Sequence, residues 1–309
     1  MAETTQSSTS MQAIIDPVDK QVLCNEIDSL RSEYLIHTRK HLEVFITPYA
    51  QIPNIIREIG RLRETTFRSI GEGTGNALDI DKYDHHYSNL FIWDRQTECI
   101  IGGYRLGLGR EIFDRLGAEG FYINSLFDID SKFNPILKTS LEMGRSYIIP
   151  SYQKNPFALL LLWRGIQILL EREGGYNYLI GPVSISKFYS GVSKSMIIAF
   201  VKRYFYDHDI AQLIKPKTPY KPPVADQETD KMLDQFGPSL RDLESFLSEI
   251  EPDHIKVPDM LKTYTRQNAK LVAFNLDPNF SDALDGLMIL DLSNMPQKTL
   301  NMLQKKGRA

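Results

Sequence analysis

Cysteine is scarce in this 309-residue chain, and its two copies, Cys24 and Cys99, lie far apart. Neither belongs to a spacing typical of zinc ligands, so the sequence predicts no metal site and no disulfide framework. The longest apolar run ends at Trp163 and is much shorter than the roughly 20 residues that a membrane-spanning helix needs. The first dozen residues have neither the basic segment nor the apolar core of a signal peptide. We therefore expect a cytoplasmic protein that does not cross the bilayer.

Two common catalytic motifs are missing as well. The glycines of "GEGTG" at 71–75 are not followed by the lysine and the serine or threonine of a phosphate-binding P-loop. The segment "GPVSISKFYSG" contains Ser184 and Ser186 but lacks the Gly-x-Ser-x-Gly turn of a serine nucleophile. For an enzyme, direct attack by the acceptor molecule is then the simpler mechanism.

The order of hydrophobic patterns predicts a mixed α/β (α+β) domain. Hydrophobic residues make up 42% of the chain, which is ample for a large core. After a disordered tail at 1–15, we expect a single domain over 16–309 with a proline-rich excursion at about 214–238. The patterns predict helices at 16–42, 52–70, 155–174, 194–209, 239–251 and 257–267, and strands at 43–49, 88–94, 99–109, 138–150, 176–186, 270–276 and 286–292. This order fits a mixed sheet with a central V-shaped opening better than a doubly wound parallel fold.

A polar cluster, "DIDKYDHHY", follows the second predicted helix. No second group of ligands accompanies it elsewhere in the sequence, so a metal site is not expected there. Asp81 and Asp84 are typical of a polar turn. Alternatively, they form a carboxylate pair that orients arginines such as Arg63 and Arg105 or binds a cationic substrate.

The most informative charges lie inside a predicted strand, in "LEMGRSYIIP". In an ideal strand Glu142 and Arg145 would point to opposite faces, because side chains alternate. Gly144 is a natural site for a β-bulge, which would bring both onto one face and leave backbone N–H groups unpaired. Such an N–H group can hold a thioester carbonyl, while the carboxylate removes a proton from an attacking amine. The alternative is a buried Glu–Arg pair with a structural role alone.

A basic segment contrasts with the net charge of −3. Between 183 and 224 there are seven basic and two acidic residues, with aromatic residues between them. An acidic carrier protein or a membrane surface could dock there through Lys194, Lys202, Arg203, Lys215 and Lys217. The other interpretation is a solvated helix end beside core aromatics.

Several long blocks occur together in the order of a known family. They include "EIGRLRETTFRSIGEGTGNALDIDKYDHHYSNLFIWD", "IIGGYRLG", "LEMGRSYIIPSYQ", "LLLLWRGI", "GPVSIS" and "AFNLDPNFSDALDGLMILDL". From about residue 17 to residue 292 the chain resembles the hemolysin-like N-acyltransferases, bacterial enzymes that acylate ornithine or glycine to begin aminolipid synthesis. That family is similar to acyl-homoserine lactone synthases and belongs to the GNAT superfamily.

The resemblance implies a GNAT-like fold, in which helices flank a central mixed, mostly antiparallel sheet. It also implies an active site with Glu142 as general base beside Arg145 and Arg105. Substrate-binding residues would be Arg63, Phe67, Asp81, Asp84, Ser184 and Ser186.

The resemblance further implies a donor and an acceptor. The donor is a 3-hydroxyacyl group on the phosphopantetheine arm of acyl carrier protein, with no bound cofactor, and the acceptor is a small amino acid. The segment "PSYQKNPFALL" lacks the turn by which acetyltransferases grip the coenzyme A pyrophosphate, which fits a carrier protein. The helix start at Asn155 could receive its single phosphate. A separate O-acyltransferase would act next, no nucleic acid is expected, and the protein could contact the inner membrane peripherally.

Two other functions remain open on the sequence. An acyl-homoserine lactone synthase would release methylthioadenosine from S-adenosylmethionine. A non-catalytic protein that binds a carrier protein or lipid would form no product and would not depend on Glu142.

Overall fold

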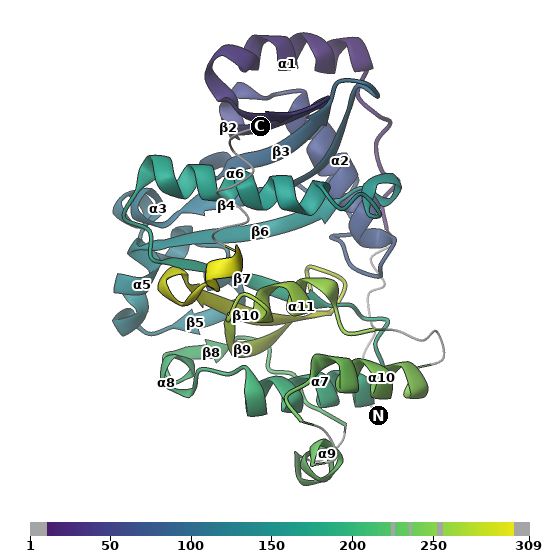
Figure 1. Ribbon diagram of the computed structural model, residues 1–309, viewed down its shortest axis with the longest axis vertical. Helices are drawn as coiled ribbons and strands as arrows, with labels where there is room; N and C mark the ends of the chain where they lie inside the picture. The colour runs from purple at the N-terminus through teal and green to yellow at the C-terminus, as the bar shows by residue number, and fades with distance from the viewer. Residues whose placement is uncertain (1–10, 224–225, 235–236, 252–255, 300–309) are drawn as a thin grey trace, which may run out of the picture.

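An eight-stranded sheet forms the centre of the computed structural model, which describes residues 11–223, 226–234, 237–251 and 256–299. In order across the sheet the strands are β1 (Leu35–Arg39), β2 (Leu42–Pro48), β3 (Ser88–Asp94), β4 (Cys99–Leu108), β6 (Ser140–Ile148), β7 (Tyr178–Ile185), β10 (Ala283–Asp291) and β9 (Lys270–Asp277). Neighbouring strands run antiparallel, except for β6 and β7, which are parallel (Figure 1). The mixed, mostly antiparallel sheet confirms the predicted fold class.

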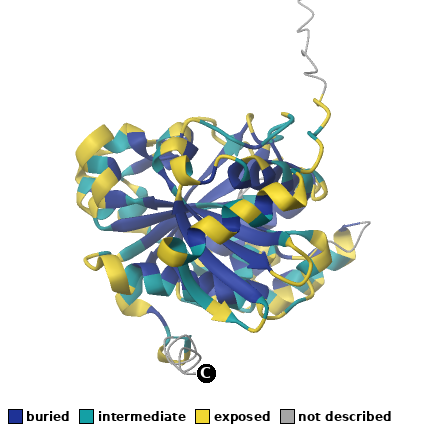
Figure 2. Cartoon of the chain, turned by 90° about the horizontal axis from the view of Figure 1, so that it is seen from above, coloured by how far each residue is buried: buried dark blue, intermediate teal, exposed yellow. Residues whose placement is uncertain are grey.

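Helices cover both faces of this sheet because alternate side chains of each strand point to opposite sides. On one face lie α6 (Ala158–Glu173), α7 (Gly191–Tyr204), α10 (Leu240–Ile250) and α11 (Asp259–Thr265), which share a core with Val44 and Ile46 of β2. On the other face lie α1 (Lys20–Tyr34) and α2 (Ile55–Arg68), which pack on Phe45 between them. The short helices α3 (Gly109–Leu116), α4 (Ile123–Leu126) and α5 (Asn134–Lys138) complete that face. In Figure 2 the strands are buried and the outer sides of the helices are exposed.

In the helix α2, the periodicity of hydrophobic residues predicts the buried apolar face correctly but does not predict a buried arginine. Its predicted apolar face is buried, with Ile55, Ile59 and Leu62 in the core. Helical periodicity counts an arginine as a surface residue, yet Arg63 of this helix is fully buried. Buried ion pairs hold this charge inside, as the site described below shows.

The N-terminal predictions need two corrections. The predicted helix at 16–42 is α1 followed by the strand β1, because the polar segment after Tyr34 pairs with β2. The predicted disordered tail at 1–15 extends too far: the backbone N–H of Gln12 donates to the carbonyl of Gly75 at 2.9 Å. Residues 1–10 lie outside the described part of the chain.

The proline-rich excursion contains regular structure. The strand β8 (Ile214–Pro216) pairs with β5 (Phe127–Ile129) in a second, two-stranded sheet. The helices α8 (His208–Ala211) and α9 (Asp226–Leu233) flank it in sequence. The sequence left β5 and its surroundings unassigned, since strands this short carry little periodic signal.

The parallel seam between β6 and β7 is short, and it positions the site. Only three residue pairs join the two strands, from Ser140–Tyr178 to Glu142–Ile180, and beyond them the strands have no shared register. Gly181 lies at the end of this seam, where a Cβ atom would come within 2.1 Å of the Met143 carbonyl oxygen. The predicted V-shaped opening is therefore present, and a glycine permits the close approach at its apex.

We expect Gly181→Ala to destabilise the fold by about 1–3 kcal/mol, because the added methyl group would push β6 and β7 apart at their seam. Chemical denaturation of the two proteins measures this difference. Gly237→Ala is the matched control, since a Cβ atom there meets nothing within 4 Å. Equal loss in both variants would contradict a tight seam.

Candidate active site

A β-bulge in β6 places Glu142 and Arg145 on the same face of the sheet. The register between β4 and β6 shifts between Gly103 and Arg105, and Arg145 has a φ of +51°. The bulge that the sequence predicted is confirmed, although the residue with positive φ is Arg145 and not Gly144. Arg145 and Ser146 have no register partner in either neighbouring strand. This stretch of backbone is therefore free of regular sheet pairing.

A cavity of about 800 Å³ fills the opening between β6 and β7. The bulge, Met143 to Ser146, lines one wall, and Pro182 to Ser184 of β7 line another. Tyr104 and Tyr264 reach the cavity from the core beneath α6 and α11. On the α2 face it is lined by Phe67, Tyr122, Phe280, Glu72 and Asp285. The cavity thus has walls from both faces of the sheet.

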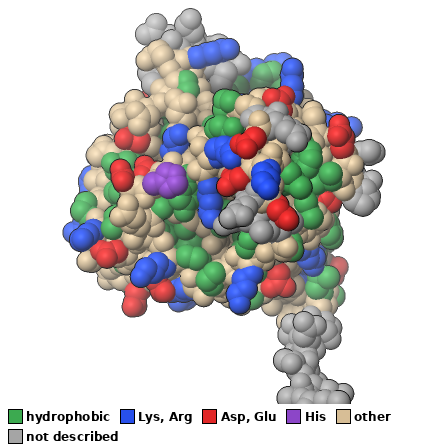
Figure 3. Space-filling view, turned by 90° about the horizontal axis from the view of Figure 1, so that it is seen from below, with side chains coloured by type: hydrophobic (Ala, Val, Ile, Leu, Met, Phe, Trp, Pro, Cys, Tyr) green, Lys and Arg blue, Asp and Glu red, His purple; other side chains and the backbone are tan. Residues whose placement is uncertain are grey.

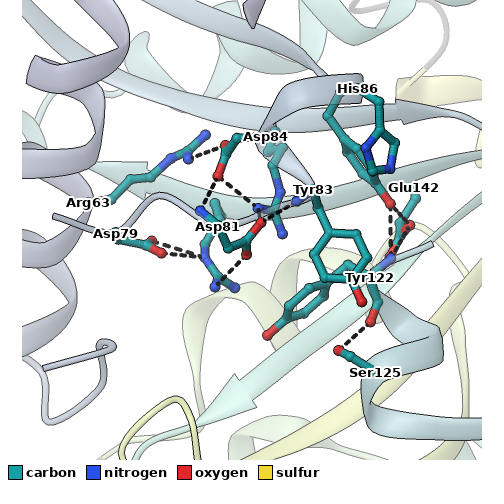
Figure 4. Close-up of polar contacts among 12 residues, drawn as sticks. Arg63, Asp79, Asp81, Tyr83, Asp84, His86, Tyr122, Ser125 and Glu142 are labelled. Atoms are coloured by element: carbon teal, nitrogen blue, oxygen red, sulfur yellow. Dashed lines mark hydrogen bonds and ion pairs between the residues drawn. The ribbon is translucent and has the colours of Figure 1, made fainter. Parts of the chain in front are cut away.

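Three arginines and three aspartates form a charged network behind this cavity (Figure 4). Arg63 donates to Asp84 at 2.8 Å, and Arg105 bridges Asp84 at 3.1 Å and Asp81 at 2.6 Å. The Arg145 Nε atom lies 2.9 Å from Asp79, while its Nη2 lies 3.4 Å from Asp81. The prediction that Asp81 and Asp84 orient Arg63 and Arg105 is confirmed.

The network sets the protonation of its members. Burial would raise the pKa of Asp84, but Arg63 and Arg105 outweigh burial and lower it. Burial lowers the pKa of Arg105, yet Asp84 and Asp81 raise it overall. In Asp79 burial dominates over the attraction of Arg145, so its pKa is raised. Asp84 therefore stays ionised in the folded protein at neutral pH.

The Glu142 carboxylate is buried and does not line the cavity. It accepts hydrogen bonds from the backbone N–H groups of Tyr122 at 3.1 Å and Ile123 at 2.9 Å, and from the Tyr87 hydroxyl (Figure 4). Burial raises its pKa, while these donors oppose that rise. This placement favours a role in positioning the start of α4, with Tyr122 beside it, over the predicted role of general base.

The predicted site residues thus separate into two groups. Four of them line the cavity, namely Phe67, Arg145, Ser184 and Ser186. The others, Arg63, Arg105, Asp81, Asp84 and Glu142, do not line it. The side chains of Arg63, Asp81 and Asp84 pair within the network, and Asp81 also contacts Arg145; that these three residues bind substrate stays a prediction.

The sequence analysis missed two buried acidic residues in the cavity wall. Glu72 lies in the glycine-rich loop that the sequence analysis considered only as a P-loop, and Asp285 lies in β10. A signal for Asp285 was available, since it is an acidic residue inside the apolar run "ALDGLMIL". An ionisable group within a buried strand requires a partner or a function.

The predicted docking surface is less basic than the sequence suggested. Lys194 is 9% exposed and cannot meet a large partner. Arg203 pairs with Asp230 at 2.9 Å and Asp234 at 3.0 Å, and Lys217 lies 3.9 Å from Asp128. Acidic residues from outside the 183–224 segment therefore neutralise part of it. Figure 3 shows basic and acidic side chains interspersed on the face seen from below.

Lys202 and Lys215 have no ion pair among the described residues, so they are the part of the predicted surface that keeps its charge. No helix in the described ranges is both long and apolar enough to cross a membrane. Within the same ranges, no cluster of three or more histidine, cysteine, aspartate or glutamate side chains could hold a metal ion.

Known proteins are similar to this chain in sequence. A family model described as an acetyltransferase (GNAT) domain matches residues 62–164. Glycine N(alpha)-acyltransferase of Bacteroides thetaiotaomicron is 31% identical over 283 residues, which are 87% of this chain and 82% of that protein. Glycine N(alpha)-acyltransferase of Phocaeicola vulgatus is 32% identical over 286 residues, which are 87% of this chain and 85% of that protein.

Two solved structures are among the similar ones. FeeM, an N-acyl amino acid synthase from uncultured soil microbes, is 11% identical with a TM-score of 0.40, covering 82% of this chain and 91% of its own. A CoA-dependent acyl-homoserine lactone synthase is 10% identical with a TM-score of 0.38, covering 84% of this chain and 87% of its own.

We expect Asp84→Asn to lower the free energy of unfolding by about 3–5 kcal/mol, because it leaves Arg63 and Arg105 buried without their shared counter-charge. Urea unfolding monitored by circular dichroism measures the change. Asp128→Asn is the control, since the exposed pair of Asp128 with Lys217 is worth at most about 1 kcal/mol. A loss below about 1 kcal/mol in Asp84→Asn would show that the network is dispensable.

Glu142→Gln tests the predicted base directly. The structure leads us to expect less stability, by about 1–3 kcal/mol, because an amide NH₂ group would face the N–H donors of Tyr122 and Ile123. Acyl-transfer rates measured well below the melting temperature should fall by less than about tenfold. A loss of about 10² or more in a folded variant is the size expected of a general base and would restore that role.

Proposed function

The chain belongs to the family of the two glycine N(alpha)-acyltransferases described above, and on that premise we propose that it transfers a 3-hydroxy fatty acyl group from acyl carrier protein to the amino group of glycine. The reaction makes an N-acyl amino acid, the first step of an aminolipid. The observation that carries the proposal is the cavity at the diverging strands, with a bulged, unpaired backbone on one wall and charged groups beside it.

The bulge supports the donor half of the reaction. Backbone N–H groups at Arg145 and Ser146 are outside the regular pairing of β6 and lie in the cavity wall. An N–H group aimed at the thioester oxygen stabilises the negative charge that develops on it, which is worth about 3–4 kcal/mol for one such donor. Because the charged network holds Arg145, the backbone at the bulge is already fixed when the donor arrives.

The start of α6 supports a carrier-bound donor. Gln153, Asn155 and Pro156 precede α6 and line the cavity, so this helix terminus lies at the cavity wall. The Asn155 side chain accepts a hydrogen bond from the Phe157 N–H at 2.9 Å and orders the turn. A helix N-terminus favours a single phosphate, as on a phosphopantetheine arm. The apolar walls at Leu159 and Met260 fit a fatty acyl chain.

The acceptor would bind near Arg145. Of the three arginines in the network, Arg145 is the one that lines the cavity, so it is the one placed to meet a substrate carboxylate. The glycine nitrogen attacks the thioester carbon, the N–C bond forms, and the C–S bond breaks. The thiol leaves with one proton, and one further proton passes to the solvent. A later O-acylation of the product's 3-hydroxyl group requires a separate enzyme.

Docking of the acidic carrier protein would use Lys202 and Lys215, the lysines of the predicted surface that keep their charge. Such a surface raises the rate of encounter more than the final affinity, and it would also suit a peripheral contact with an anionic membrane face.

Mass spectrometry of lipids from a bacterium that expresses this protein tests the proposal. Cells fed isotopically labelled glycine should accumulate labelled N-(3-hydroxyacyl)glycine, whereas labelled ornithine should give none. The control strain carries an empty vector and should lack the product.

Three further results would point to the rival functions. Product formed from ornithine alone would contradict the proposed acceptor. Release of methylthioadenosine from S-adenosylmethionine would instead identify a homoserine lactone synthase. A purified protein that binds acyl carrier protein but forms no amide would be a binding protein.

A further inference from the structure

Three acidic residues line the cavity outside the charged network; Asp259 is exposed and pairs with Lys262 at 2.8 Å, whereas the other two are buried. Glu72 is 8% exposed and Asp285 is 1% exposed, and both side chains line the cavity together with Arg145 and Ser184. Glu72 comes from the loop after α2, and Asp285 comes from β10, where it stands opposite Ser184 of β7. The two acids thus come from segments far apart in sequence.

The Glu72 carboxylate lacks the partners that other buried acids of this chain have. Asp84 accepts hydrogen bonds from two arginines and a backbone N–H, and Glu64 accepts them from Arg68, Thr74 and Gly75. In the described part of the chain, no hydrogen bond or ion pair reaches the side chain of Glu72. Burying an acid without a partner is costly, so such a group in a cavity points to a ligand with hydrogen-bond donors.

The Asp285 carboxylate has one hydrogen bond, accepted from the Ser184 hydroxyl at 2.6 Å. This contact fixes one oxygen and leaves the other without a partner in the described residues. Among nearby charged groups, Arg145 of β6 opposes a rise of its pKa and Asp277 of β9 favours one. Asp277 is itself occupied, since it accepts from the Tyr122 hydroxyl at 3.0 Å and the Asn279 N–H at 2.9 Å.

We propose that Glu72 and Asp285 form the subsite for the ammonium group of the amino acid, and that Asp285 accepts the proton that this group must lose to attack the thioester. The inference rests on the proposed function and adds the acceptor side to it. Arg145 would hold the carboxylate end of the same molecule. A cavity with an arginine and two free carboxylates in its wall matches a small zwitterion.

The electrostatics agree with this geometry. Burial, followed by the charge of Asp285, raises the pKa of Glu72 to about 8. Burial raises the pKa of Asp285 to about 7, with Asp277 adding to it and Ser184 and Arg145 opposing it. A base is most effective when its pKa lies near the working pH, and burial brings both acids into that range. The hydrogen bond from Ser184, which fixes one oxygen of Asp285, favours Asp285 as the proton acceptor. The carboxylate of Glu142 is outside the cavity and cannot reach this amine directly.

The proton balance is simple. The bound ammonium gives one proton to Asp285, and the amine then forms the N–C bond. As the C–S bond breaks, the second proton lost from nitrogen goes to the leaving thiolate. Asp285 returns its proton to solvent before the next cycle.

Steady-state kinetics of Asp285→Asn and Glu72→Gln test the inference with 3-hydroxyacyl carrier protein and glycine as substrates. We expect kcat/KM of Asp285→Asn to fall by about 10² or more near neutral pH. The deficit should shrink as the pH rises toward 9, because more glycine is then already deprotonated. Glu72→Gln should mainly raise the KM for glycine. Asp291→Asn is the control and should match wild type, because the side chain of this aspartate farther along β10 binds Ser293 and no other side chain in the described ranges.

The wild-type pH profile gives a second readout. As the pH falls through about 7, Asp285 becomes protonated, and kcat/KM for glycine should decline with it. Ser184→Ala removes a hydrogen bond that lowers the pKa of Asp285, so this decline should move to higher pH. Ser184→Ala decides the matter if Asp285→Asn does not fold: an upward shift supports the inference, and an unchanged profile overturns it.

The outcomes separate the two proposals. A wild-type protein that forms no N-acylglycine refutes the proposed function. If the wild-type protein forms N-acylglycine, the proposed function stands. If folded Asp285→Asn then keeps a kcat/KM within tenfold of the wild-type value and an unchanged pH profile, only the role of Asp285 is refuted.

Discussion

Charge balance inside the sheet is the constraint on which the site depends. Alternating arginines and aspartates run from Arg63 to Asp79 through buried space, and each charge touches one of opposite sign. A buried ion pair gains little over apolar packing, but one unpaired member is very costly, so the six side chains must be present together. Because Arg145 is part of the network, the strand that carries it cannot relax its bulge without breaking the ion pairs of Arg145 with Asp79 and Asp81. The charged network therefore keeps this wall of the cavity ordered.

Two buried aspartates of this protein have opposite pKa shifts, because their neighbours differ. Asp84 is surrounded by arginines, which lower its pKa and make it a permanent anion. Asp285 has a serine and an acidic neighbour, and burial raises its pKa toward neutrality. Permanent anions suit a scaffold, while a group that gains and loses a proton near pH 7 suits proton transfer. Position relative to the arginines, more than residue identity, decides the function of each acid.

The sequence predicted seven of the eight strands of the large sheet, the bulge, and the pairing of Asp81 and Asp84 with arginines, because each depends on local pattern or on charge. It did not predict that Arg63 is buried, since helical periodicity counts an arginine as a surface residue. The positive charge of the predicted docking surface was also overestimated, because acidic residues from other segments pair with it. The partners of Arg203 come from the later helix region at Asp230 and Asp234, and a count within one segment cannot include them. The role of Glu142 depends on which donors surround its carboxylate, and only the three-dimensional fold brings those donors together.

The short seam between β6 and β7 divides the cavity between two parts of the chain. The residues that line it run from Thr66 to Asp285, and the GNAT model that matches 62–164 includes the bulge but neither β7 nor β10. A ribosome adds the charged network and the bulge early in translation, when one wall of the cavity is still missing. The opposite wall is complete only when β10 emerges and docks beside β7. The cavity is consequently complete in the nascent chain only after β10 has been synthesised.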